Sequence, residues 1–89
     1  MRKYQVTLSV PDEFIINQIA GRERRPTADE MEEFASLLAD ELLADYDELI
    51  EFVVYQVTNY GDRPTVSYID VSREEMDAMV ERATDKWLR

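Results

Sequence analysis

At residues 27–46 the chain reads TADEMEEFASLLADELLADY, the longest helical pattern in a sequence of 89 residues. At 100° per residue its apolar side chains gather on one side, as in a helix that packs one face against a core. Thr27 and Glu30 have the spacing of a capping box, in which each side chain accepts a hydrogen bond from an unpaired amide of the first turn. The sequence therefore predicts a helix that starts at Thr27, with a core side made of Met31, Ala35, Leu38, Leu42 and Tyr46.

The flanking sequence predicts further elements on both sides of this helix. Lys3–Val10 alternates polar and apolar residues, as a half-buried strand does, and Pro11 begins a short helix to about residue 20 that ends at Gly21. Leu49–Thr58 and Thr65–Val71 are rich in β-branched and aromatic residues and flank a turn, which predicts a hairpin. A second capping box, Ser72 with Glu75, opens a last helix.

This order of elements predicts one α+β domain over residues 1–89. We expect a three-stranded, mostly antiparallel sheet with helices packed on one face, in the order β-α-α-β-β-α. The strand from Leu49 to Thr58 is apolar on both sides, so both of its faces should be at least partly covered, by a central position in the sheet or by a protein contact.

The composition argues against several classes of protein. Without histidine or cysteine the chain lacks the usual general base and the imidazole and thiolate metal ligands, and two glycines cannot build a phosphate-binding loop. Asp45 and Asp47 have the spacing of a calcium loop, but Ile50 stands where that loop needs glycine. We therefore expect no catalytic residue, no cofactor and no metal site. No apolar run could span a membrane, and the absence of cysteine favours a reducing cytoplasm.

The acidic residues are unevenly distributed along the chain. The net charge is -10, and residues 26–62 hold eleven carboxylates and no lysine or arginine, whereas the other residues hold nine acids and ten bases. Exposed helices usually place a base three or four residues from an acid, but Asp29/Glu33 and Glu41/Asp45 are like-charged at this spacing. Because this arrangement opposes helix stability, it indicates a surface kept for binding.

We expect a non-enzymatic binding protein whose partner is a basic protein surface. A row of carboxylates offers a groove lined with lysine and arginine the charge that it normally meets on phosphates, so the protein would mimic a nucleic acid without binding one. Size and charge suggest, by analogy, an inhibitor of the phage anti-CRISPR or anti-restriction type, which blocks the nucleic-acid channel of a nuclease or immune effector complex. The expected contact residues are Asp29, Glu32, Glu33, Asp40, Asp47 and Glu48, with Glu41, Asp45 and Glu51 at the margin.

Other interpretations of the same sequence stay open. The acidic helix would serve only solubility if the protein were a structural or regulatory subunit, or a homodimer, that pairs through the sheet face of Val53, Tyr55 and Val57. The bases at residues 22, 24 and 25 of one copy would also form a salt-sensitive homodimer by docking on the acids of another. Adaptation to high salt is disfavoured, because residues 1–25 and 63–89 have balanced charges.

Overall fold

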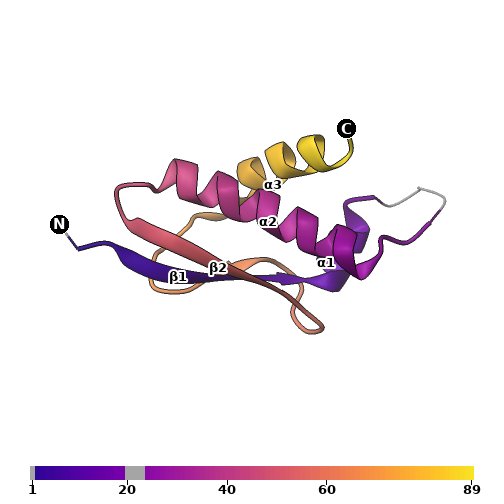
Figure 1. Ribbon diagram of the computed structural model, residues 1–89, viewed down its shortest axis with the longest axis horizontal. Coiled ribbons are helices and arrows are strands. Elements are labelled where there is room, and N and C mark those ends of the chain that lie inside the picture. Colours follow the sequence, from indigo (N-terminus) through magenta and orange to yellow (C-terminus); the bar gives the residue numbers. More distant parts are fainter. Residues whose placement is uncertain (1, 20–23) are drawn as a thin grey trace.

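The computed structural model describes residues 2–19 and 24–89, which form a sheet and a layer of helices. The elements are β1 (Tyr4–Pro11), α1 (Asp12–Asn17), α2 (Ala28–Asp45), β2 (Ile50–Thr58), β3 (Thr65–Val66) and α3 (Arg73–Trp87). The two long helices, α2 and α3, lie on one face of the sheet (Figure 1). The expected α+β class and order of elements are confirmed. The helix expected to reach about residue 20 is shorter, because α1 ends at Asn17. Gly21, and Arg22 of the basic connector (residues 22–26), lie outside the described residues.

β1 is the central strand of the sheet, whose order is β2-β1-β3. It pairs in parallel with β2, from Tyr4 beside Ile50 to Pro11 beside Thr58, and antiparallel with the two residues of β3. Parallel neighbours cannot be joined by a tight turn, so the chain needs a crossover between β1 and β2. The segment that contains α1 and α2 supplies this crossover.

The predicted hairpin between residues 49–58 and 65–71 is wrong. β2 and β3 lie on opposite sides of β1, and β3 is only two residues long. The turn residues between them carry the chain past the end of β1. There Gly61 has a φ of +91°, and a Cβ on it would lie 3.3 Å from Cγ of Pro11. Glycine thus fits both the backbone conformation and the close approach to β1 that this connection requires.

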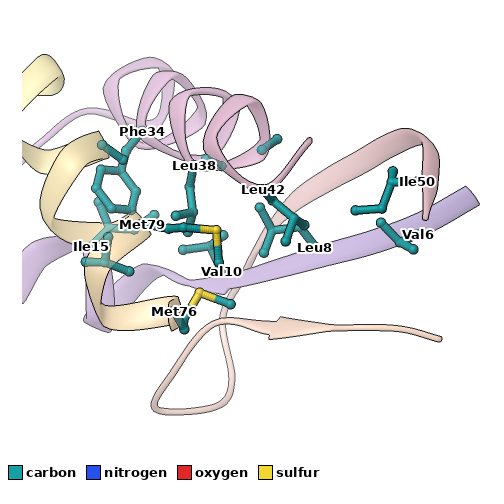
Figure 2. Close-up of a cluster of buried hydrophobic side chains, with 14 residues drawn as sticks. Val6, Leu8, Val10, Ile15, Phe34, Leu38, Leu42, Ile50, Met76 and Met79 are labelled. Atoms are coloured by element: carbon teal, nitrogen blue, oxygen red, sulfur yellow. The ribbon is translucent and has the colours of Figure 1, made fainter. Parts of the chain in front are cut away.

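The core lies between β1 and the two long helices. Val6, Leu8 and Val10, at alternate positions of β1, are at most 1% exposed. Figure 2 shows Leu38 and Leu42 projecting from α2 toward this row. The predicted core side of α2 is therefore correct at its centre, but the prediction omitted Phe34, whose side chain is fully buried. Phe34 packs edge-on against Trp87 of α3, with ring centroids 5.1 Å apart.

The helix starts follow the sequence closely. Thr27 Oγ1 accepts from the amide of Glu30 (3.2 Å), and the Glu30 carboxylate accepts from the amide of Thr27 (2.9 Å), so the first capping box is confirmed. At the start of α3, Ser72 Oγ accepts from the amide of Glu75 (3.1 Å). The Glu75 carboxylate accepts instead from the hydroxyls of Ser72 and Tyr46, so only half of the second predicted box forms.

We predict that Leu38→Ala lowers the free energy of unfolding by about 2–5 kcal/mol, because it removes a fully buried side chain from the middle of the core. Urea unfolding followed by the fluorescence of Trp87 measures this loss. Leu49→Ala is the control, since Leu49 is 37% exposed and its truncation should cost less than about 1 kcal/mol. Equal losses in the two variants would contradict the placement of the core under α2.

Candidate functional site

Four of the predicted contact residues lie on the outward side of α2. Asp29, Glu32, Glu33 and Asp40 are all exposed, and they fall within about 100° of arc opposite the buried Leu38. We call these four residues the acidic stripe. From Asp29 to Asp40 the stripe runs along roughly 16 Å of helix.

Asp47 and Glu48 extend the acidic surface beyond the end of α2. The helix ends at Asp45, and Tyr46 leaves the helical conformation with φ -126° and ψ 32°. The amides of the next residues, Leu49 and Ile50, donate to the Tyr46 carbonyl oxygen and close a tight turn into β2. Asp47 and Glu48 are exposed in this turn, so the acidic helix, whose extension past Asp45 the sequence leaves open, does not reach Asp47, and these two carboxylates lie on a turn.

The stripe and its extension are not neutralised by the described part of the chain. Within residues 2–19 and 24–89, the ion pairs involve five other carboxylates, those of Glu13, Glu30, Glu41, Asp45 and Asp77. No base among these residues pairs with any of the six predicted central contacts, so their carboxylates are available to a partner.

Glu41 was expected to be a marginal contact for the partner, but its side chain does not lie on the exposed surface. Its side chain is only 11% exposed, between α2 and α3. Arg82 Nε donates to one carboxylate oxygen (2.5 Å) and Lys86 Nζ to the other (2.7 Å). These hydrogen bonds, that of Lys86 first, hold the pKa of Glu41 below its usual value despite the burial, which acts in the opposite direction. Glu41 thus joins the two helices and is not available as a contact.

Asp45 belongs to the same group of charges. A terminal nitrogen of Arg82 donates to Asp45 Oδ2 (2.7 Å), so one arginine bridges two carboxylates of α2. The sequence contains a signal for this, because Arg82 and Lys86 are four residues apart and share one side of a helix. The signal did not indicate which acids they would meet, since that depends on the antiparallel packing of α3 against α2.

Two more acids lie apart from the stripe. Glu51, the third marginal contact, is exposed on β2, where the register with β1 shifts between Tyr4 and Gln5. Glu30, at the start of α2, accepts from Arg24 at 2.7 Å and 3.0 Å. This pairing, with the amide of Thr27, lowers the pKa of Glu30 to about 2. Of the basic connector, Arg24 is thus engaged within the chain.

The sheet face expected to pair with a partner is partly covered by the helices. Val53 and Val57 pack against the core, on the same side of the sheet as Val6 and Val10 of β1. β2 is an edge strand and not a central one, and the long helices lie on the other side of the sheet, so its opposite face is open, with Phe52 42% and Val54 52% exposed. Both alternating sets are apolar, so the sequence alone did not distinguish the covered side from the open one.

The described residues contain no group of three or more Asp or Glu side chains arranged to hold a metal ion. Likewise, none of the described helices combines the length and apolar character needed to cross a membrane.

We predict that Glu41→Gln lowers the free energy of unfolding at pH 7 by about 1 kcal/mol, a value discounted because Arg82 and Lys86 remain partly exposed. A carboxylate with a lowered folded pKa stabilises the fold above its unfolded pKa and loses this effect as the pH falls through its folded pKa. The difference between wild type and variant should therefore shrink below about pH 4.5.

Urea unfolding of both proteins between about pH 3 and 7 checks this pH dependence. Asp40→Asn is the matched control, because Asp40 is exposed and forms no ion pair with a described residue. A Glu41→Gln loss that stayed constant over this pH range would contradict a role for the carboxylate charge.

In comparisons with known proteins, neither a family model, nor a curated protein, nor a solved structure matches this chain.

Proposed function

We propose that this protein is a non-enzymatic inhibitor that occupies a basic, nucleic-acid-binding groove of another protein. The acidic stripe and its extension at Asp47 and Glu48 would take the place of phosphates in that groove. The partner is a protein surface lined with lysine and arginine, such as the channel of a nuclease or immune effector complex, as for inhibitors of the phage anti-CRISPR or anti-restriction type.

The main support is the way charge is divided around α2. On the side toward α3, the carboxylates of Glu41 and Asp45 are neutralised by Arg82 and Lys86. On the outward side, no described base pairs with the stripe, although the like charges of Asp29 and Glu33 destabilise the helix by a few tenths of a kcal/mol. The chain thus neutralises the acids of α2 that face α3, whereas no described base pairs with those of the stripe.

The charge density supports phosphate mimicry in particular. The four carboxylates of the stripe occupy roughly 16 Å of helix, so their average separation along the axis is roughly 5.5 Å. One strand of B-DNA carries a phosphate every 3.4 Å or so. Ser36 interrupts the stripe between Glu33 and Asp40, so its spacing is less regular than that of phosphates. A groove whose cations have flexible side chains can follow such a surface.

The fold provides rigid support for the stripe. Phe34, Leu38 and Leu42 are fully buried on the opposite side of α2, so the helix cannot rotate without losing core contacts. Little conformational entropy is therefore lost when the helix backbone binds, which favours affinity. The lack of cysteine suits action in a reducing cytoplasm.

We predict that Asp40→Lys combined with Asp47→Lys weakens partner binding by at least about 100-fold at low salt, because repulsion replaces attraction at two central positions. The matched control is Glu74→Lys combined with Glu81→Lys, which makes the same change in net charge on exposed positions of α3. This control should lose much less affinity, since only the long-range attraction is reduced.

The measurement has two steps. Proteins captured from a lysate of the native host on the immobilised protein are eluted with rising salt and identified. Each purified partner is then tested for release of bound DNA or RNA when this protein is added. Competition with nucleic acid that disappears for the Asp40→Lys, Asp47→Lys protein and persists for the Glu74→Lys, Glu81→Lys protein supports the proposal. A partner that holds nucleic acid and this protein together, or equal losses for both variants, would contradict it.

A further inference from the structure

The outer edge of β2 is long and uncharged over most of its length. β1 occupies one side of β2, and no described strand pairs with the other side. The strand has nine residues, no proline and one charge, Glu51, near its start. Exposed edges in natural proteins are usually shortened, charged, interrupted or covered, because unpaired backbone groups invite another strand. From Phe52 to Val57, β2 has no such protection among the described residues, and Thr58 at its end is buried.

The side chains along this edge are suited to burial. Phe52 and Val54 are 42% and 52% exposed on the open face of the sheet, and Tyr55 is 43% exposed on the helix side. Their neighbours on the open face of β1 are uncharged, with Gln5 beside Phe52 and Thr7 beside Val54. In a chain of net charge -10, the part of β2 from Phe52 to Gln56 is a surface where another molecule of the same chain can approach without meeting a carboxylate of the strand.

We propose that β2 pairs antiparallel with β2 of a second copy of this chain, about a twofold axis at Val54. The two sheets then form one sheet of six strands, with all helices on the same side. Val54 lies opposite the partner's Val54, Phe52 opposite the partner's Gln56, and Val53 opposite the partner's Tyr55. This register uses the whole of β2 and satisfies the backbone groups along its outer edge.

The charge pattern of β2 favours a second copy in this orientation. In the antiparallel register the two Glu51 side chains lie six residues apart along the strands, roughly 20 Å. Parallel pairing would instead place them side by side, which is unfavourable. Every directly opposed pair from Phe52 to Gln56 is uncharged, so the strand is complementary to itself in only one direction.

The size of the interface predicts a weak dimer. A strip roughly 30 Å long and about 13 Å wide buries about 800 Å² over both copies, at the low end for specific association. Two copies of net charge -10 also repel each other, and salt screens this repulsion. Dimerisation should therefore strengthen as salt rises. A dimer formed by arginines docking on acids, and the inhibitor complex proposed above, would both weaken.

Cysteine substitution tests the register directly, because the chain contains no native cysteine. Directly opposed residues of antiparallel strands have Cα atoms about 4.5–5.5 Å apart, within reach of a disulfide. V54C should therefore form a covalent dimer under mild oxidation. F52C, of similar exposure, is the control, since its two copies would lie roughly 14 Å apart and should react at least about tenfold more slowly. Equal rates, or no covalent dimer of V54C, would overturn the proposal.

Charge substitution tests the same contact without covalent chemistry. V54K and V54E should each sediment as monomers, because like charges meet at the axis, and an equimolar mixture should recover the dimer. Q5K adds a charge to the open face of the central strand and should leave dimerisation intact. If Q5K instead abolished the dimer, the two copies would be stacked face to face, which would refute edge pairing. The proposal also fails if the wild type stays monomeric from about 50 to 500 mM salt, where the Debye length falls from about 14 to 4 Å. None of these positions belongs to the acidic stripe, so the result is independent of the inhibitor function.

Discussion

The structure depends on β1 lying at the centre of the sheet with one face buried. Val6, Leu8 and Val10 are covered on that face, and both edges of the strand pair with other strands. These contacts fix the position of α2 on the sheet, because the buried residues of α2 pack against the same three side chains of β1. α3 then packs antiparallel to α2, and this arrangement determines which charges meet. The electrostatic surface of the protein is therefore a consequence of its apolar core.

Where the two long helices pack together, α2 supplies the acids and α3 supplies the bases. α3 contributes Arg82 and Lys86 toward α2, where Glu41 would otherwise be a nearly buried carboxylate without a partner. An unpaired charge at that depth would cost several kcal/mol, so its compensation is a condition of helix packing. The outward carboxylates face no such requirement, because water solvates them at little cost. Helix packing thus explains the pairing of Glu41, but it does not account for the unpaired acids of the stripe.

Local patterns predicted the helices well, because their causes are local. The capping residues Thr27 and Ser72 and the apolar spacing of α2 depend on neighbours within one or two turns. The strand pairing was not predictable in the same way. The turn chemistry around Gly61 suits a hairpin as well as a connection past Pro11, and only the three-dimensional position of β1 separates the two. The pairing of Glu41 and the openness of Phe52 and Val54 depend on the same long-range choice.

The parallel pairing of β1 with β2 has a consequence for biosynthesis. Tyr4 leaves the ribosome early, yet its neighbour in the sheet, Ile50, is made only after the whole crossover has been synthesised. No pair of strands adjacent in the sheet is joined by a tight turn, so the nascent chain cannot form any part of the sheet from local contacts. Until β2 emerges, the backbone of β1 cannot form the hydrogen bonds of their parallel pairing. β1, which is translated before β2 and β3, can thus complete its hydrogen bonds only after both of these strands have emerged.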